Sequence, residues 1–578
     1  MKTSFSDSEF PLRFVSKRSS STIKTGFQRF QRPVYDYPSK YSPCRAACPA
    51  AHDIALALFL VSKGRFDLAR ELFLEESPFP GITGRVCYHP CETACNRAGY
   101  DEAIAINALE RAIDAYGTEP FEAPKTAYPE SVGIVGAGPA GMTCAYHLRL
   151  LGYAVTVYDA NPTPGGMLSH GIPAYRLPSE VTQKATAELQ ALGVEFVCGV
   201  CVGRDISFDE LRRRHNALFL APGLSKSRKI AGLPETPRAV SGLDFLRAVR
   251  ANGKMPLSGR VLVLGGGDVA VDAARSALRC GAASVTICCP EPAGEMPAHP
   301  QEVSSALAEG ILVADRVLPE AVQQCEDGIT VRFRKVEAVE RKGGGYFFRT
   351  GAETAFHGPA DYLIYAIGQE AELSFLPEGL CENGRIACGP FGETAEPGVF
   401  AGGDAVGTYN VVNAIASAKR AAVGIDCYLR GWSTDGLEQR ISVGPGGPIS
   451  MRAYRDIRRG FCVTPAVEKV PLELINLDYF PKAPRVALPK AGSTTDFSEV
   501  NLTLGRTAAE AEAQRCFNCG LCNMCGNCFQ FCPDSAVLRR KGWGFEIDLD
   551  HCKGCAVCVE ECPRGAMSMV PEPNTEAE

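Results

Sequence analysis

The stretch that decides the fold is Ser131-Val-Gly-Ile-Val-Gly-Ala-Gly-Pro-Ala-Gly141. It reads as a short apolar strand followed by G-x-G-x-x-G, with glycines at Gly136, Gly138 and Gly141. The first glycine permits a tight turn, the second lets a pyrophosphate approach the backbone, and the third lets the next helix meet the strand. The sequence therefore predicts a dinucleotide-binding unit whose helix begins near Pro139.

A second strand and an acidic residue complete this unit. The apolar run Ala154–Tyr158 predicts the strand, and Asp159 stands at its end, 18 residues after Gly141. A carboxylate in that place can bind a ribose hydroxyl. A glycine-rich turn without a ligand would explain the glycines alone, whereas the strand, the helix and the acid in register predict nucleotide binding.

A second unit of the same kind follows at Gly259-Arg-Val-Leu-Val-Leu-Gly-Gly-Gly-Asp-Val-Ala270. Its strand Val261–Leu264 leads into three consecutive glycines, and its second strand is expected at Ser284–Cys289. Two such units in one chain imply two nucleotides, and a flavin beside a nicotinamide is the usual pairing.

Two short segments indicate that the second unit is inserted into the first. Ala221-Pro-Gly223 follows the apolar run Ala217–Leu220, and Ala366-Ile-Gly368 follows Tyr362–Tyr365. Both have the form of crossover segments between nested domains.

The end of the first unit carries a further acid. Gly398-Val-Phe-Ala-Gly-Gly-Asp404 puts an aspartate after a strand, where flavoproteins bind the ribityl chain. The helix expected from about Val411 to Ala421 would point its positive N-terminus at the flavin pyrimidine ring.

The strongest signal is a dense cysteine group near the C-terminus. Two runs share the spacing C-x2-C-x2-C-x3-C-P, which is the two-cluster bacterial ferredoxin pattern, and the fourth cysteine of each run ligates the other cluster. Zinc knuckles are the alternative, but they rarely need an internal twofold repeat or trailing prolines. One [4Fe–4S] cluster is expected on Cys522, Cys525, Cys528 and Cys562, and another on Cys552, Cys555, Cys558 and Cys532.

Composition narrows the class of protein. A net charge of −6 argues against nucleic acid as the main partner. The stretch Met1–Phe10 lacks the apolar core of a secretory signal, and the longest apolar run, Ile54–Val61, is too short for membrane insertion. We therefore expect a cytoplasmic protein whose 26 cysteines serve metal or redox chemistry rather than disulfides.

At this point the chain resembles the small subunit of bacterial glutamate synthase and its relatives, over residues 44 to 431. The resemblance is carried by Gly165-Gly-Met-Leu-Ser-His-Gly-Ile-Pro-Ala-Tyr-Arg-Leu-Pro178, Gly265-Gly-Gly-Asp-Val-Ala-Val-Asp272, Met296-Pro-Ala298 and Arg85-Val-Cys-Tyr-His-Pro-Cys-Glu-Thr-Ala-Cys95. It implies FAD in the first unit and NAD(P)H in the second.

The predicted fold is α/β, with two nested Rossmann-like domains, for FAD and NAD(P), between a helical iron–sulfur domain and a ferredoxin-like 2[4Fe–4S] domain. The expected divisions are an N-terminal arm (1–43), the helical iron–sulfur domain (44–125), the FAD domain (126–256 and 366–431), the NAD(P) domain (257–365), a Pro-rich wrapping linker (432–505) and the ferredoxin domain (506–578).

The predicted nucleotide sites follow from these motifs and the resemblance, and the cofactors are expected to carry the chemistry without a catalytic side chain. The expected FAD residues are Gly136, Gly138, Pro139, Ala140, Gly141, Asp159, Gly166, Met167, Arg176, Ala221, Gly223, Gly403, Asp404 and Asn413. The expected NAD(P) residues are Gly265, Gly266, Gly267, Asp268, Val269, Glu291 and Gly368.

An N-terminal group of five cysteines, Cys44, Cys48, Cys87, Cys91 and Cys95, suffices for one cubane but not for two. The resemblance implies one cluster on Cys48, Cys87 and Cys91 with Glu110 as fourth ligand, and half of a second site on Cys44 and Cys95. The family's early Arg-Cys-x-x-Cys-Gly element is absent before Cys44, yet Arg515-Cys-Phe-Asn-Cys-Gly520 has this form. Either Cys516 and Cys519 fold back to complete the second cluster, or they are free thiols and the domain holds one cluster.

The choice between NAD(H) and NADP(H) is predicted from a position at which this sequence departs from the family. Relatives that use NADPH usually carry an arginine pair after the second strand of the nicotinamide domain, because guanidinium groups bind a 2′-phosphate bidentately. Here the place reads Cys288-Cys-Pro-Glu-Pro292, and Glu291 would repel a phosphate but accept a ribose hydroxyl. NAD(H) is therefore favoured over NADP(H), unless Arg275 or another basic group reaches the site.

The function expected is an NADH:acceptor oxidoreductase that passes electrons between nicotinamide, FAD and clusters, to or from ferredoxin or a larger enzyme, as a subunit of a hetero-oligomer. The ferredoxin tail and the arm Lys24–Val34 resemble small subunits of 2-oxoacid:ferredoxin oxidoreductases, and such fusions also resemble the flavoprotein of dissimilatory sulfite reductase. The alternatives are an NADPH-dependent glutamate synthase small subunit and a non-catalytic electron-conducting subunit.

Overall fold

The first glycine turn follows the central strand of a five-stranded parallel sheet with the order β19-β6-β3-β4-β5. These strands are β3 (Ser131–Val135), β4 (Ala154–Asp159), β5 (Val194–Cys198), β6 (Ala217–Leu220) and β19 (Val399–Ala401). The residues of β6 and β19 are all buried, as expected for parallel strands covered on both faces. Because β19 joins β6 from far along the chain, the first domain is interrupted, as predicted.

The computed structural model describes residues 30–118, 125–229, 236–325, 328–342, 345–491, 495–542 and 544–572. Within them no helix is long and apolar enough to cross a membrane. The arm segment predicted to resemble other small subunits, Lys24–Val34, lies outside the described residues up to position 29.

Two long helices flank the first sheet. They are α7 (Pro139–Leu151), which begins directly after the glycine turn, and α14 (Val411–Arg430), which packs against it. The predicted end of the second helix, Ala421, was wrong, because the helix continues through a further buried stretch. It ends where Gly431 adopts a left-handed conformation (φ +65°) and closes the last turn.

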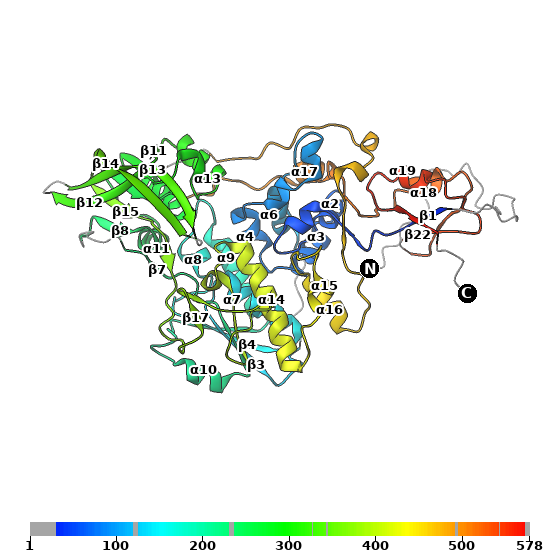
Figure 1. Ribbon diagram of the computed structural model, residues 1–578, viewed down its shortest axis with the longest axis horizontal. Helices are drawn as coiled ribbons and strands as arrows, with labels where there is room; N and C mark the ends of the chain where they lie inside the picture. Colours follow the sequence, from blue (N-terminus) through cyan, green and yellow to red (C-terminus); the bar gives the residue numbers. More distant parts are fainter. Residues whose placement is uncertain are drawn as a thin grey trace.

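The inserted domain has its own five-stranded parallel sheet, with the order β11-β10-β9-β15-β8. Its strands are β8 (Ala239–Ser241), β9 (Arg260–Leu264), β10 (Ser284–Cys288), β11 (Leu312–Ala314) and β15 (Tyr362–Tyr365), and its helices are α11 (Gly242–Asn252), α12 (Asp268–Arg279) and α13 (Pro300–Ala308). Figure 1 shows this domain at one end of the elongated molecule.

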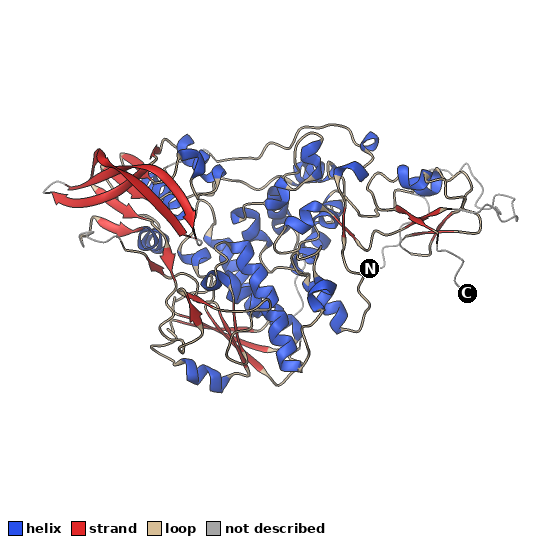
Figure 2. Cartoon of the chain, viewed as in Figure 1, coloured by secondary structure: helices blue, strands red, loops and turns tan. Residues whose placement is uncertain are grey.

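A three-stranded antiparallel sheet within this domain was not predicted. It consists of β12 (Val317–Cys325), β13 (Gly328–Lys342) and β14 (Gly345–Ala360), drawn as long red arrows in Figure 2. Val331 and Phe333 of β13 pack with Leu262 of β9, so the extra sheet covers one face of the parallel sheet.

The N-terminal domain is helical, as predicted. Its helices are α1 (Pro43–Ala47), α2 (Ile54–Val61), α3 (Phe66–Leu74), α4 (Pro80–Val86), α5 (Pro90–Thr93) and α6 (Ile106–Tyr116). A buried ion pair joins it to the first dinucleotide domain: Lys419 Nζ of α14 lies 2.7 Å from Glu76 Oε2 and donates to the Ala50 carbonyl. One hydrophobic core runs through both domains.

The segment predicted as a linker is partly helical. It contains α15 (Leu437–Ile441), α16 (Met451–Arg458) and the short strand β20 (Glu468–Lys469). The start of α16 is anchored because Ser450 Oγ and the Met451 amide both donate to Glu76, at 2.6 and 2.7 Å. After it, α17 (Arg506–Gln514) packs on α2 and α6, so the chain returns to the N-terminal domain.

A ferredoxin-like module forms the other end of the molecule (Figure 1). It contains α18 (Asn527–Gln530), α19 (Val557–Glu560) and the hairpin β21 (Val537–Arg539) with β22 (Phe545–Ile547). The described part of the N-terminal arm belongs to it, because β1 (Gln31–Val34) pairs antiparallel with β23 (Ser568–Pro571).

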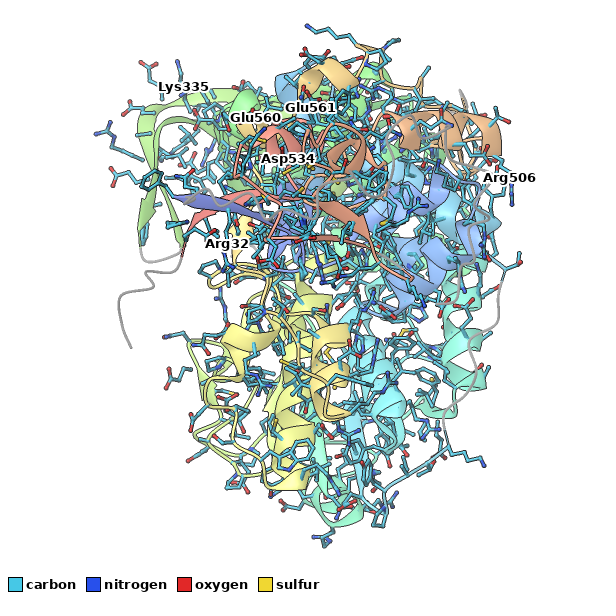
Figure 3. All side chains as sticks on the ribbon, turned by 90° about the vertical axis from the view of Figure 1, so that its right-hand side faces the viewer. Arg32, Lys335, Arg506, Asp534, Glu560 and Glu561 are labelled. Carbon is cyan, nitrogen blue, oxygen red and sulfur yellow. The ribbon has the colours of Figure 1, made fainter. Side chains whose placement is uncertain are left out.

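Lys40 and the linker fasten this module to the body. The buried Lys40 Nζ donates to the Gly565 carbonyl (2.9 Å) and to Ser568 Oγ (2.7 Å). On the linker, Asn476 Nδ2 donates to the Glu560 carbonyl at 2.9 Å, and the Tyr479 hydroxyl donates to the Glu561 carboxylate. Figure 3 looks onto this end of the molecule, where Glu560 and Glu561 are labelled.

Candidate functional site

A cavity of about 260 Å³ lies where the two parallel sheets meet. It is lined by the first glycine turn, by the loop after β4, by the segment after β6, by the turn before α14 and by the first residues of α12. Of the predicted nucleotide residues, those lining it are Gly136, Gly138, Pro139, Ala140, Asp159, Gly166, Met167, Arg176, Ala221, Gly223, Asp268, Val269, Gly403 and Asp404. Both predicted sites thus contribute to one cavity.

The three glycines of the first turn have different surroundings. Gly136 has φ +101°, and a Cβ there would lie 2.1 Å from the Ala221 carbonyl oxygen. A Cβ on Gly141 would lie 1.8 Å from the Gly136 oxygen, so the start of the helix packs directly on the turn. A Cβ on Gly138 would meet nothing within 4 Å. The open space therefore lies at the glycine where a pyrophosphate is expected, which fits a bound dinucleotide.

Two carboxylates of the first domain are held in place by local hydrogen bonds. Asp159 Oδ2 accepts from the Ala137 amide at 2.6 Å, and its Oδ1 accepts from the Asn161 amide at 2.7 Å. Asp404 Oδ1 accepts from Thr408 Oγ1 at 3.0 Å, while burial raises the pKa of its carboxyl. The predicted residues Gly141 and Asn413 do not line the cavity, and Asn413 Nδ2 donates to the Thr408 carbonyl at 3.4 Å.

In the second domain the glycine turn has the same form. Gly265 has φ +127°, a Cβ there would lie 2.3 Å from the Ala366 oxygen, and a Cβ on Gly267 would meet nothing within 4 Å. The carboxylate of the buried Glu291 lies behind this turn, since a Cβ on Gly266 would come within 2.8 Å of Glu291 Oε2. The structure therefore brings the predicted acid to the predicted turn. Gly368 follows β15 at φ +111°, and its carbonyl accepts from the Arg228 amide.

Arg275, the basic residue that could have bound a 2′-phosphate, forms ion pairs with carboxylates instead. Arg275 is buried, and its guanidinium donates to Glu302 Oε2 and to Glu309 Oε1, each at 2.7 Å. The predicted FAD residue Arg176 likewise lies in the cavity wall but is paired across the domain boundary, with Nη1 at 2.8 Å from Asp272 Oδ2 of α12. The Arg176–Asp272 pair joins the flavin-side loop to the inserted domain, whereas the pairs of Arg275 lie within that domain.

The N-terminal domain reaches the cavity on either side of a cysteine. Val86 and Tyr88, which flank Cys87, both line it. The Tyr88 ring stacks on His299 of the inserted domain, with centroids 4.5 Å apart and an angle of 7° between the planes. Neither residue was predicted, and only the adjacency of Tyr88 to a predicted ligand marked it in the sequence.

The first group of thiols, called set A here, consists of Cys48, Cys87 and Cys91 with Glu110. Burial raises the pKa of Glu110 to about 8, although Thr83 Oγ1 donates to its Oε1 at 2.6 Å. Burial, and then the charge of Glu110, raise the pKa of Cys48 to about 11 and that of Cys87 further. The mutual effects of these groups show that they share one buried neighbourhood.

The second group, set B, consists of Cys44, Cys95, Cys516 and Cys519. Burial first, and then Cys95, Cys516 and Cys519 raise the pKa of Cys44. Burial, and then Cys95, raise the pKa of Cys516 to about 12; burial, and then Cys516 and Cys95, raise that of Cys519 to about 12. Asn96 Nδ2 lies 3.4 Å from Cys519 Sγ. The sequence left open whether Cys516 and Cys519 fold back or are free thiols. The structure brings the four thiols of set B together, as the fold-back requires.

Two further groups lie in the ferredoxin-like module. Set C is Cys522, Cys525, Cys528 and Cys562, which line one small cavity with Tyr35, whose hydroxyl donates to Cys528 Sγ at 3.3 Å. Set D is Cys532, Cys552, Cys555 and Cys558, which line another. Each set thus takes its fourth cysteine from the other run, as the spacing predicts. Among the described residues, no three metal-binding side chains converge closely enough for a single ion.

The sets follow one another outward from the large cavity. Set A is next to it, because Val86 and Tyr88 on either side of Cys87 line the cavity. Burial, and then the charges of Cys48 of set A and Cys44 of set B, raise the pKa of Cys91, so sets A and B adjoin. Burial lowers the pKa of Arg564, whereas thiols of both set B (Cys516 and Cys519) and set C (Cys525 and Cys562) raise it. Arg564 therefore lies near both sets. Sets C and D share the module, in which α18 packs on α19.

Fold and site together define a protein with two dinucleotide domains and attached iron–sulfur domains. The pyridine nucleotide-disulphide oxidoreductase family matches residues 130–422, the 4Fe-4S domain II of dihydropyrimidine dehydrogenase matches 36–120, and a 4Fe-4S binding domain matches 545–568. The chain belongs to the pyridine nucleotide-disulphide oxidoreductase family. It is an oxidoreductase, and its cofactors are FAD, a nicotinamide nucleotide and [4Fe–4S] clusters, as the sequence predicted.

Curated relatives match most of the length of this chain. The chain is 35% identical to the NADP(+)-dependent formate dehydrogenase subunit beta of Moorella thermoacetica, over 83% of this chain and 71% of the relative. It is 32% identical to the NADPH-Fe(3+) oxidoreductase subunit beta of Geobacter sulfurreducens, over 84% and 76%. It is 34% identical to the NAD-dependent dihydropyrimidine dehydrogenase subunit PreT of Escherichia coli, over 68% and 92%.

Proposed function

We propose that this chain is the electron-transfer subunit of a larger redox enzyme, and that electrons move between a nicotinamide nucleotide at the cavity and the far end of the ferredoxin-like module through sets A, B, C and D. The observation that carries the proposal is the unbroken succession of thiol sets outward from the cavity. FAD, when bound, accepts a hydride and releases electrons singly, which the clusters require.

The chain's own residues hold the nucleotides in this proposal. The open space at Gly138 would admit the FAD pyrophosphate, Asp159 would bind its adenosine ribose, and Asp404 its ribityl chain. Gly267 and the first turn of α12 would receive the nicotinamide pyrophosphate, since a helix N-terminus attracts anions. Arg176 would act on the flavin side by fixing the inserted domain through Asp272.

For the remaining ligands, we assign Glu110 to the set A cluster and the pair Cys516 and Cys519 to the set B cluster. The burial of Glu110 among three thiols supports the first assignment, because an isolated carboxylate there would be costly. The shared electrostatics of the four set B thiols support the second. Four clusters per chain follow from these assignments.

The proposed nucleotide is NADH. Glu291 lies behind the second glycine turn, and Arg275 is engaged by Glu302 and Glu309. A carboxylate in that place would accept a ribose hydroxyl and repel a 2′-phosphate. The relatives' names are divided, since two carry NADP(H) and PreT carries NAD.

Anaerobic titration of the full chain with NADH and, separately, NADPH tests this proposal. Rapid bleaching of flavin and clusters by NADH is expected, with little bleaching by NADPH at the same concentration. A Glu291→Gln variant should bleach faster with NADPH than the wild type, because it removes the repulsion. Bleaching of the wild type by NADPH alone would overturn the nucleotide assignment, and bleaching by neither would overturn the function.

The relatives are named as subunits, which supports a hetero-oligomer with a protein redox partner. In the proposal, the partner exchanges electrons at the module, where Cys525 of set C and Cys555 of set D are exposed. A 2-oxoacid:ferredoxin oxidoreductase, a dissimilatory sulfite reductase and ferredoxin remain the partners predicted from the sequence, and the cytoplasm remains the predicted location.

A further inference from the structure

Arg564 occupies the junction between the ferredoxin-like module and the N-terminal iron–sulfur domain. Its Nη1 donates to the Phe517 carbonyl at 2.5 Å and to Asn518 Oδ1 at 2.9 Å, and both acceptors lie between Cys516 and Cys519 of set B. Its own carbonyl accepts from the Gly520 amide at 2.7 Å. The same residue lines the cavity enclosed by set C. One side chain therefore borders two thiol sets from different modules.

The charge of Arg564 faces both sets. The guanidinium bonds to the segment between Cys516 and Cys519 of set B, and the residue lines the cavity bordered by the four set C thiols. Its Nε is buried and makes no hydrogen bond to the residues that the structure describes. A buried donor without a partner is costly, and the sulfur atoms of a cluster would supply an acceptor. This orphaned donor fits a group that occupies the neighbouring site.

Other cations near these thiols are neutralised by carboxylates. Arg97 lies 2.6 Å from Asp101, and Arg515 lies 2.8 Å from Glu512. Lys40 lies 3.1 Å from Asp36. For Arg564, by contrast, no ion pair with a carboxylate is found among the described residues, and the guanidinium lies over the Phe480 ring, 5.4 Å from its centroid. Its positive charge is thus directed at the thiol sets.

Reduction adds one negative charge to a cluster, and a nearby buried cation stabilises that charge more strongly than an exposed one. Hydrogen bonds to cluster sulfur and local net charge are among the terms that set cluster potentials. We propose that Arg564 is a positioning residue that stabilises the reduced forms of the set B and set C clusters together and fixes these two sets side by side. The inference rests on the proposed function, because it requires clusters on both sets.

The test compares Arg564→Gln and Arg564→Lys in the full chain with the matched control Arg540→Gln. Arg540 belongs to the same module but is exposed and paired with Glu546 at 3.4 Å. Iron and sulfide per chain are measured first, and then the midpoint potential of each cluster is measured by redox titration with electron paramagnetic resonance. Arg564→Gln should lower two of the four potentials while iron per chain stays constant. In Arg564→Lys both midpoint potentials should stay close to their wild-type values, and in Arg540→Gln no midpoint potential should change.

Unchanged potentials in an iron-replete Arg564→Gln protein would overturn the inference. So would a shift confined to one cluster, because the charge would then serve a single site. If Arg564→Gln loses iron, the lysine variant decides: full iron with near-wild-type potentials supports the charge role, and loss of iron there as well overturns it. A wild-type chain with fewer than four clusters would instead contradict the proposed function, and is recognised before any variant is made.

Discussion

The two pairs of thiol sets are built in different ways. Sets C and D come from two adjacent runs within about forty residues of chain, so their ligands are close whatever the rest of the molecule does. Set B takes Cys44 and Cys95 from the N-terminal domain and Cys516 and Cys519 from the segment after α17. Set A depends on a domain whose core continues into the flavin domain. The N-terminal sets therefore depend on tertiary structure, and the C-terminal sets depend mainly on local sequence.

The largest expected effect is the loss of a whole cluster. The double variant Cys516→Ser, Cys519→Ser removes two of the four set B ligands, and we expect about four fewer iron atoms per chain. Iron and sulfide analysis measures this, with Cys388→Ser, Cys462→Ser as the control, because both cysteines are exposed and outside the four sets. Unchanged iron would mean that the N-terminal domain holds one cluster.

The second effect concerns the buried ion pair that joins the N-terminal domain to α14. Glu76→Gln leaves the Lys419 charge buried without its carboxylate, and removal of one partner of a buried pair costs about 3–5 kcal/mol. We expect a clearly lower melting temperature, measured anaerobically, and earlier loss of sets A and B than of C and D.

The control for this prediction is Arg204→Gln, which breaks the exposed pair with Asp205 and is expected to leave the melting temperature close to the wild-type value, because solvent screens an exposed pair. If Glu76→Gln melts like this control, the pair does not hold the two domains together.

Much of this comparison was available from the sequence. Both glycine turns, the strands that lead into them and the crossed ligand sets of the module follow from local spacing. The partners of Cys44 and Cys95 did not, because the signal is a string of six residues far along the chain whose position depends on how α17 packs on α2 and α6. The antiparallel sheet β12–β14 was missed for a similar reason, since its strands were read as part of an alternating α/β pattern.

Contacts between side chains of different domains could not be predicted from the sequence either. Tyr88 stacks on His299 more than two hundred residues away, and Arg564 donates to a backbone carbonyl of another segment. Such contacts leave no periodic or motif signal, because each partner is an ordinary residue in its own local context. The same holds for Arg275, whose engagement by Glu309 is visible only in the folded chain.

A smaller effect is expected where Lys40 fastens the ferredoxin-like module to the rest of the molecule. Lys40→Met removes the donor to the Gly565 carbonyl and Ser568 Oγ, and loss of this donor costs about 1–3 kcal/mol. Hydrogen exchange of β1 and β23 should become faster, while iron per chain stays the same. Unchanged exchange would show that strand pairing alone fastens the module.

The smallest effect is expected within set C itself. Tyr35→Phe removes one hydroxyl donor to Cys528 Sγ, and a single such bond contributes about 0.5–1.5 kcal/mol. All iron should remain, with a slightly lower midpoint potential for one cluster. A loss of iron would mean that set C depends on the N-terminal arm as strongly as set B depends on its distant segment.

The central claim is that set B connects the flavin end of the molecule to the module. Anaerobic rapid mixing of Cys516→Ser, Cys519→Ser protein with NADH tests it most directly, with the flavin and the module clusters followed separately by absorbance and electron paramagnetic resonance. The account predicts that the flavin is reduced at the wild-type rate while the clusters of sets C and D stay oxidised. Reduction of those clusters at the wild-type rate would contradict it, because electrons would then reach the module without set B.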